Sequence, residues 1–256
     1  LIGFIAAKGL VHFWPGEIVA AEYTLPGNES TKILGQVSDS EMVSAIQLKA
    51  IGLTTKDDAE EAERILIKVG NRDVYGGDFR WVLDHHLSNK TYPEKAMAVE
   101  RREWGNFYGY LDKVYEGHDM VADVAQDDEK AWESFQALIE RALDIHESIM
   151  DIQKGEIGSI NYELERLRLK ERAYELDEEL TDERKQDLAE RREELNKEYE
   201  VHQITLNQLY TDLKRDHFTA KEMGGQVVEI HISEVVRAFR PNSMSIGEKI
   251  GHYFSK

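Results

Sequence analysis

The sequence contains no cysteine, only four prolines, and fewer basic than acidic residues. Without cysteine the chain can form neither a disulfide nor a zinc–thiolate site, and a thiol nucleophile is excluded. No apolar run reaches the ~20 residues that a transmembrane helix needs. Hydrophobic residues make up 41% and charged residues 32% of the 256 positions, a composition typical of a folded domain with one large or two small cores.

The shortage of basic residues bears on the partners that the chain can bind. Its 32 Lys and Arg side chains are outnumbered by 50 Asp and Glu, so the formal net charge is −18 at pH 7. A surface of this sign repels nucleic acid and anionic lipid headgroups. We therefore expect no nucleic-acid partner.

The first residues resemble the end of a membrane helix. The apolar stretch 1–10 is followed at once by His12, Phe13 and Trp14, and aromatic residues concentrate at membrane interfaces. The basic start and small-residue cleavage site of a secretory signal are missing. We expect residues 1–16 to be the tail of a transmembrane helix and its membrane-proximal segment. The alternative is an amphipathic first helix of a soluble protein.

Short apolar runs separated by turn residues predict a small α/β base domain, formed by residues 17–128 and 214–240. The expected β-hairpins pair residues 18–25 with 32–37, 107–115 with 120–124, and 217–221 with 226–232, and a further strand covers residues 65–69. Helices are expected at residues 57–63 and 79–87. The last hairpin is expected to close the same sheet that the first one begins.

The segment 129–213 is of a different kind, because it lacks proline and its apolar residues recur every three or four positions. Its second half has a heptad seam, which is typical of two helices that pack along a narrow stripe. The residues of this seam are Leu188, Leu195, Tyr199, His202, Leu206, Leu209 and Leu213. Thr181 is a good N-cap for the second helix, and acidic residues follow it.

These patterns predict an α+β fold, in which a small mixed α/β base domain carries a long antiparallel coiled-coil helical hairpin. Each helix would project roughly 45–65 Å at 1.5 Å per residue. Gly155 and Gly158 interrupt the first helix, and we expect them to make room for His202 and Tyr199 opposite. Replacing Gly155 with Leu would then destabilise the hairpin. The alternative is a kink or break in the helix.

Motifs for catalysis or cofactor binding are missing from the sequence. No glycine-rich phosphate loop ends in Gly-Lys-Ser or Gly-Lys-Thr, and no serine lies in a nucleophile elbow. His85 and His86 are neighbours, but adjacent helical residues diverge by about 100° and rarely share an ion. We therefore expect a protein that is not an enzyme and holds no cofactor or metal.

Two segments, residues 70–81 and 100–110, are rich in Arg, Trp and Tyr. These residue types are enriched at protein interfaces, and they equally form the core and rim of a small sheet. A small-ligand pocket is the third possibility. The candidate protein-contact residues are Arg72, Tyr75, Arg80, Arg101, Arg102, Trp104 and Tyr108.

Five segments resemble a known family. They are Gly9-Leu-Val-His-Phe-Trp-Pro15, residues 68–79, residues 100–109, residues 157–172 and Val235-Val-Arg-Ala-Phe-Arg-Pro-Asn242. In this order, along almost the whole chain, they resemble the enlarged PstA-type permease subunits of gamma-proteobacterial phosphate ABC transporters. In that family a long extracytoplasmic segment is inserted between the first and second transmembrane helices.

The resemblance implies a domain on the periplasmic side of the bacterial inner membrane, with residues 241–256 leading towards the second membrane helix. The implied partners are the periplasmic phosphate-binding protein and the partner permease subunit. The cytoplasmic ATPase subunit would be contacted only through parts of the parent chain outside this sequence, and the membrane through the flanking helices. No phosphate-binding or catalytic residue of the family can be carried over.

Two other classes of protein stay open. A soluble enzyme with a coiled-coil arm would need a deep pocket lined by convergent polar groups with shifted acidities. A free-standing coiled-coil adaptor would need no base domain with interface-like residues.

Overall fold

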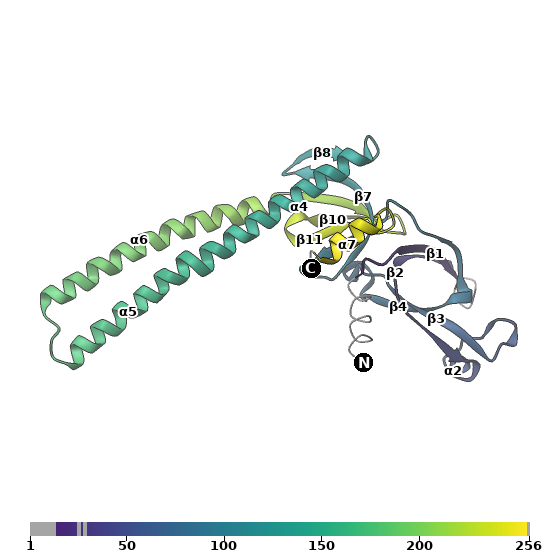
Figure 1. The fold of residues 1–256 in the computed structure, drawn as a ribbon, viewed down its shortest axis with the longest axis horizontal. Coiled ribbons are helices and arrows are strands. Elements are labelled where there is room, and N and C mark those ends of the chain that lie inside the picture. Colours follow the sequence, from purple (N-terminus) through teal and green to yellow (C-terminus); the bar gives the residue numbers. More distant parts are fainter. Residues whose placement is uncertain (1–13, 25–26, 28–29, 255–256) are drawn as a thin grey trace.

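The computed structural model describes residues 14–24, 27 and 30–254, so most of the segment predicted to end a membrane helix lies outside the described residues. The fold is mixed α/β, with two antiparallel sheets and one long helix (Figure 1). Among the described residues, the helices are too short or too polar to cross a bilayer.

The first sheet contains five strands in the order β4-β3-β2-β1-β5. The strands are β1 (Ile18–Thr24), β2 (Ser30–Ser44), β3 (Glu61–Lys68), β4 (Phe79–Leu83) and β5 (Leu87–Thr91). The connections contain α2 (Ala45–Ala50), the 3₁₀ turn η1 (Lys56–Asp58), α3 (Arg72–Tyr75) and the 3₁₀ turn η2 (Asp84–His86). The predicted first hairpin is confirmed, since β1 and β2 pair antiparallel.

The second sheet has the order β10-β9-β7-β6-β11, with β8 (Asp119–Asp123) paired to β7 beside this path. Its strands are β6 (Met97–Arg101), β7 (Phe107–Glu116), β9 (His217–Lys221), β10 (Val227–His231) and β11 (Val235–Phe239). The 3₁₀ turn η4 (Ile232–Glu234) precedes β11. The β7–β8 and β9–β10 pairings confirm the two other predicted hairpins.

The two sheets are built on one plan, because their strands pair in the same order and in the same register. Between the first two strands, Val19 lies opposite Gly35 in one sheet, and Met97 lies opposite Gly109 in the other. The next residue of the second strand pairs with the last residue of the third strand. This pair is Gln36 and Lys68 in the first sheet, and Tyr110 and Lys221 in the second. Each sheet then has its bulge at the same place, after Val37 and after Leu111.

The match extends to the last two strands and to the cores. A 3₁₀ turn directly precedes β5 and β11, and each of these strands returns to pair with the first strand of its sheet. We call β1–β5 the first unit and β6–β11, without the helices and β8, the second unit. Matching positions fill the two cores, namely Val19, Ala21, Ile33, Ile67 and Val82 in the first unit and Met97, Val99, Phe107, Ala220 and Ile230 in the second.

The two units pack on each other through matching positions as well. One buried cluster contains Ile18, Ala20 and Leu34 from the first unit, and Ala96, Ala98 and Tyr108 from the second. Each unit presents the same three positions to the other, as the subunits of a symmetric dimer do. Asn242 closes this junction, because its side chain donates to the carbonyls of Ile18 and Pro93 and accepts from the Ile18 N–H.

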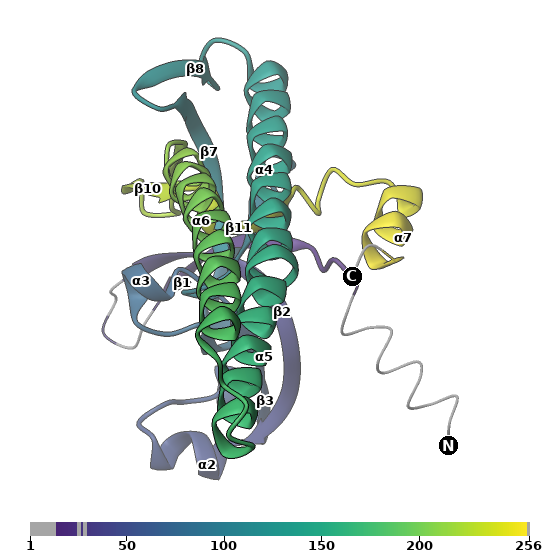
Figure 2. The same ribbon diagram turned by 90° about the vertical axis from the view of Figure 1, so that its left-hand side faces the viewer.

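The helical arm leaves the second unit between β8 and β9. A 49-residue helix consists of α4 (Asp128–Asp151), the π-helical segment η3 (Ile152–Glu156) and α5 (Ile157–Leu176). The helix α6 (Asp182–Leu213) returns alongside it in the opposite direction (Figures 1 and 2). The side chain of Thr181 accepts a hydrogen bond from the Arg184 N–H, which confirms the predicted N-cap.

The inner half of α4 is fixed to the second unit. Phe135 lies among the core residues of the sheet and its ring centroid is 4.5 Å from that of Phe218. At the start of the helix, Asp128 forms a bidentate ion pair with Arg240, whose guanidinium stacks over Trp132. The last helix, α7 (Ile246–Phe254), follows β11.

Three expectations about the base are wrong. Residues 79–87 form β4, η2 and the start of β5 instead of a helix, and residues 57–63 hold only a 3₁₀ turn before β3 begins. Short apolar runs such as Trp81-Val-Leu83 do not distinguish strand from helix, and here pairing with β3 decides. The last hairpin pairs with β7 of the second sheet rather than closing the first.

The prediction for Gly155 and Gly158 is also wrong. The contacts Glu171–Arg192 and Gln153–Tyr210 fix one antiparallel register, in which Gly155 lies level with Gln208 instead of His202. Gly155 is exposed, and an added Cβ would meet no atom within 4 Å. It lies in the π-helical segment η3, where the helix is irregular in its hydrogen bonding but is not broken.

Gly109→Ala is expected to destabilise the protein by roughly 1–3 kcal/mol, because overpacking forces the backbone to shift. A Cβ at this position would lie 2.6 Å from the carbonyl oxygen of Lys221. Gly155→Ala is the control, and is expected to be neutral or stabilising by up to about 1 kcal/mol. Urea denaturation measures both changes, and an unchanged midpoint for Gly109→Ala would show that the close approach is misplaced.

Candidate functional site: a contact surface and the root of the arm

The two predicted contact segments dock against each other. The side chain of Asn71 donates to the carbonyl of Tyr108 and accepts from its N–H, at 2.9 and 2.7 Å. The Asn71 N–H also bonds the Asn106 carbonyl. Asn71 has a positive φ of 52°, a conformation that Asn tolerates better than most residues. The pairing joins the loop after β3 of the first unit to β7 of the second.

Arg101 is a structural residue of this junction. Its side chain is 1% exposed and forms two hydrogen bonds of 2.8 and 2.9 Å with Asp73 of α3. It also donates to the carbonyls of Trp104 and Gly105. The hydrogen bonds from Arg101 hold the pKa of Asp73 below its ordinary value, against the opposing effect of partial burial.

The seven predicted contact residues therefore divide into three groups by their burial. Arg101 and Tyr108 are buried, so the prediction that they contact a partner is wrong, and they belong to the core as the alternative held. Arg72, Tyr75, Arg102 and Trp104 are exposed. Arg80 is half-buried and its guanidinium lies 5.1 Å from the ring of Tyr23.

The exposed members lie on two segments that Arg101 joins, and we call these exposed residues together the contact surface. Arg101 joins α3, which carries Arg72 and Tyr75, to the loop that carries Arg102 and Trp104. Tyr75 and Trp104 are 51% and 53% exposed, although aromatic rings of this size usually bury most of their area. A rigidly held Arg and aromatic surface has the composition of interaction hot spots.

Tyr75 ties this surface to the last hairpin through Glu222, a residue that the sequence did not single out. The Tyr75 hydroxyl donates to Glu222, and partial burial together with this hydrogen bond raises the pKa of Tyr75. Burial alone would raise the pKa of Glu222, but hydrogen bonds from Tyr75 and from the N–H groups of Gly224 and Gln226 outweigh it. The pKa of Glu222 therefore lies below its ordinary value.

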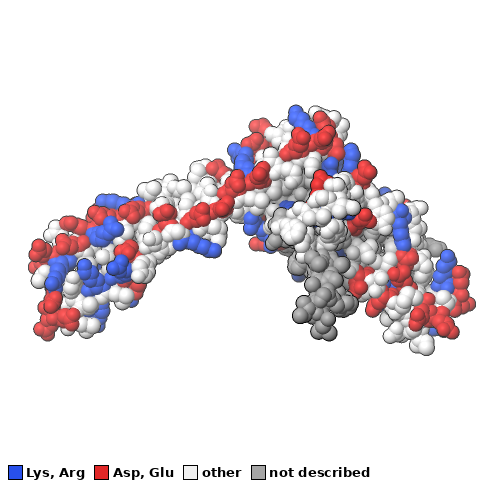
Figure 3. All heavy atoms as spheres, viewed as in Figure 1, with Lys and Arg blue, Asp and Glu red and all other residues white. Residues whose placement is uncertain are grey.

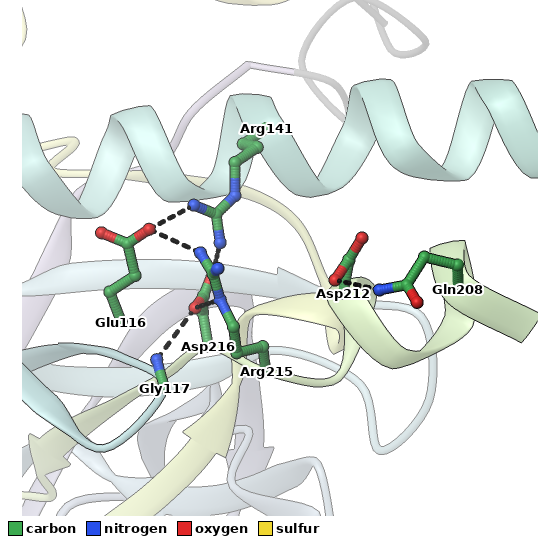
Figure 4. Close-up of polar contacts among 7 residues, drawn as sticks. All are labelled: Glu116, Gly117, Arg141, Gln208, Asp212, Arg215 and Asp216. Carbon is green, nitrogen blue, oxygen red and sulfur yellow. Dashed lines mark hydrogen bonds and ion pairs between the residues drawn. The ribbon is translucent and has the colours of Figure 1, made fainter.

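A second polar cluster lies where the arm leaves the sheet (Figure 4). Asp216 is buried and accepts hydrogen bonds from Arg141 of α4, from Arg215 and from the Gly117 N–H. Glu116 pairs with the same two arginines, and the hydrogen bond from Arg141 is the main reason that its pKa is lowered. We call these four side chains, Glu116, Arg141, Arg215 and Asp216, the root cluster.

The root cluster connects both ends of the arm to the sheet. Glu116 ends β7, Asp216 precedes β9, and Arg141 lies on α4 between them. Arg141 pairs with both carboxylates, so α4 cannot swing away from the sheet without breaking its ion pairs with Glu116 and with the buried Asp216. Sequence reasoning missed this cluster, because its members are separated by up to 100 positions and follow no local motif.

The outer part of the arm carries charges of both signs. Ion pairs three residues apart on α5 join Glu163 to Arg166, Glu165 to Arg168 and Arg172 to Glu175. Figure 3 shows the acidic and basic side chains interspersed along this face of the arm. Such exposed pairs each contribute little stability. The outer part of the arm therefore has a solvated surface that is polar along most of its length.

Comparison of the chain with protein-family models, with characterised proteins and with solved structures gave no match. Across the residues that the structure describes, no three His, Asp or Glu side chains converge in a way that could hold a metal ion. The function must therefore be argued from the geometry and from the sequence resemblance.

Asp73→Asn is expected to lower the free energy of unfolding by roughly 2–4 kcal/mol at pH 7, because it leaves the buried Arg101 without a counter-charge. The folded-state pKa of Asp73 is lowered, so its contribution is present above the unfolded pKa of about 3.9 and is lost as the pH falls through the folded value. The difference between the variant and the wild type should narrow as the pH falls below about 4. A difference that stays constant down to pH 2 would contradict the ion pair.

Asp216→Ala is expected to cost roughly 2–4 kcal/mol, because Arg141 and Arg215 lose a shared buried partner. Asp212→Ala is the matched control, since Asp212 accepts a hydrogen bond from Gln208 of its own helix (Figure 4). That variant should change the stability by less than about 0.5 kcal/mol. Equal urea midpoints for the two variants would show that the root cluster does not hold the arm.

Proposed function

We propose that the chain is a non-catalytic extracytoplasmic domain of a phosphate ABC importer permease of the PstA type. It would contact the periplasmic phosphate-binding protein or the partner permease subunit. The resemblance of five ordered segments supports the family, and the periplasmic side of the inner membrane follows from it. Phosphate translocation and ATP hydrolysis would belong to other parts of the transporter.

The observation that carries this proposal is the long two-helix arm, rooted in the second unit and projecting far from it (Figure 1). An exposed arm of this length buries little of its own surface and has no catalytic use by itself. It can reach a second protein while the base stays in place. The contact surface around Tyr75 and Trp104 offers a second place of attachment on the base.

The arm itself is proposed to be an antiparallel coiled coil. Exposure along α6 follows the predicted seam, with Leu188, Leu195, Leu206 and Leu213 buried and Tyr199 half-buried. On α5 the apolar residues Ile157, Ile160, Leu164 and Leu167 are buried or half-buried and recur at spacings of three and four, and the half-buried Glu171 and Tyr174 continue this spacing. Knobs-into-holes packing along a 3.5-residue repeat would stiffen the arm over its whole length.

The enzyme and adaptor alternatives find less support. A groove of about 730 Å³ lies between α4 and β11, and its lining includes Ile139, Leu143 and the ion pair Glu100–Arg237. Two of its three charged groups, Glu100 and Arg237, are engaged with each other, and the third is Glu140 of α4. A free-standing adaptor would not need two sheet units and a contact surface at the root of its arm.

Shortening the arm tests the proposal. Residues 162–201 can be replaced by a tight turn without changing the register, because residues 162 and 201 lie level in it. The inner core around Phe135, Leu206 and Leu213 stays in place. We expect this variant to keep its fold and to lose at least tenfold in affinity for the cognate phosphate-binding protein, as measured by calorimetry.

The same titrations with and without phosphate decide what the arm recognises. Tighter binding of the phosphate-loaded form would mean that the domain selects cargo-bearing partners. If the intact chain binds neither form, the partner permease subunit is tested in the same way. An importer with the short arm that transports phosphate normally and couples normally to its binding protein would refute the role.

A further inference from the structure

The matching registers of the two units show that the arm has a counterpart. In the second unit the last pair between the second and third strands is Tyr115 and His217, whose rings stack with centroids 4.6 Å apart, and β8 and the arm are inserted between these two residues. In the first unit the same position is occupied by the ion pair Glu41–Arg64. Residues 42–63, which contain α2, therefore occupy in the first unit the place that β8 and the arm occupy in the second.

We call residues 42–63 the tip. The tip and the arm project in different directions and end at opposite ends of the molecule (Figure 1). In the tip, β2 and β3 continue their ladder to Ser44 and Glu61 and then give way to α2. In the second unit, β7 turns back as β8, and the helices of the arm then connect β8 to β9. The tip and the arm therefore both lie between the second and third strands of a unit.

The tip is built as a rigid element. Ser44 caps α2 and forms a capping box with Gln47. Leu48, which is 1% exposed, packs with Val43, Ala62 and Leu83 in a small core of its own. The Ala45 N–H bonds the Glu60 carbonyl across the tip. The residues that the tip displays are therefore held in fixed positions.

What the tip displays is apolar. Met42, Ile46 and Ile51 are 60%, 83% and 64% exposed. Single exposed apolar side chains are common on proteins, but three within one short projecting element, with a filled core beneath them, are not needed for folding. Two apolar residues of the arm, Val201 and Ile204, are also exposed, but they lie on a helix that carries charges of both signs. They therefore serve as a comparison for the apolar residues of the tip.

The charges around the tip define the surface that it can meet. The tip contains five acidic side chains, Asp57, Asp58, Glu60, Glu61 and Glu63, against the two basic side chains Lys49 and Lys56. Figure 3 shows acidic side chains gathered at this end of the molecule. An anionic membrane repels such a surface, whereas a protein face with an apolar centre and a Lys and Arg rim complements it.

We propose that the tip is a second docking surface. Its partner would be a folded protein that presents an apolar patch with a rim of basic residues to the tip. Together with the arm it would make the domain a bridge between two contact points. The inference rests on the proposed function for the identity of the partner, which would be one of the two transporter components named above. The chemistry of the docking surface comes from the tip alone.

Site-specific photocrosslinking in cells that produce the full-length protein tests this inference. A benzoylphenylalanine is incorporated at position 46 on the tip or at position 204 on the arm, which are 83% and 70% exposed. Position 46 is expected to crosslink to the phosphate-binding protein or to the partner permease subunit. Binding of that purified partner should then fall at least tenfold in Ile46→Asp and weaken with added salt, while Ile204→Asp leaves the tip contact unchanged.

The other outcomes separate the two proposals. Crosslinks to a transporter component from position 204 but none from position 46 would overturn the docking role of the tip and leave the proposed function intact. Crosslinks from position 46 to lipid would also overturn it. A protein outside the transporter that crosslinks to position 46, and whose purified form loses affinity in Ile46→Asp, would support the tip and refute the proposed function. No crosslink from either position would refute both.

Discussion

The packing of the two units against each other is the constraint on which the rest of the structure depends. Ala20 and Ala98 are small enough for the two sheets to approach closely, and Leu34 and Tyr108 fill the space beside them. Side-chain amides of Asn71 and Asn242 pair with backbone groups across the junction, so these buried backbone groups keep hydrogen-bond partners. This junction sets the directions in which the tip and the arm project.

The arm depends on the base in a second way. A two-helix segment that packs along one narrow stripe buries little apolar area per residue, so its orientation must come from its root. Phe135 supplies the apolar part of that root, and Asp216 with its two arginines supplies the polar part. Bending at the root would expose Phe135 and break the ion pairs of Arg141 with Glu116 and Asp216. The arm therefore behaves as an extension of the second unit.

Local patterns were enough to predict much of the fold. The three hairpins, the N-cap at Thr181 and the helical character of residues 129–213 follow from period, turn residues and capping, which act within a few positions. The predictions of a helix at 79–87 and of a residue opposite Gly155 were wrong because they concern features that distant parts of the chain decide. Their outcomes depend on β3 and on the register of α6, which lie far away in the sequence.

By itself the sequence determined the mixed α/β class, the strands of the hairpins and the extent of the helical arm, because these follow from local periodicity. Only the tertiary structure revealed that one unit occurs twice, since the second copy is interrupted by the arm and matching positions such as Ile33 and Phe107 share little beyond being apolar. The tertiary structure also decided that Arg101 is buried while Trp104 is exposed. Burial depends on which distant segment covers a residue, and no local pattern contains that information.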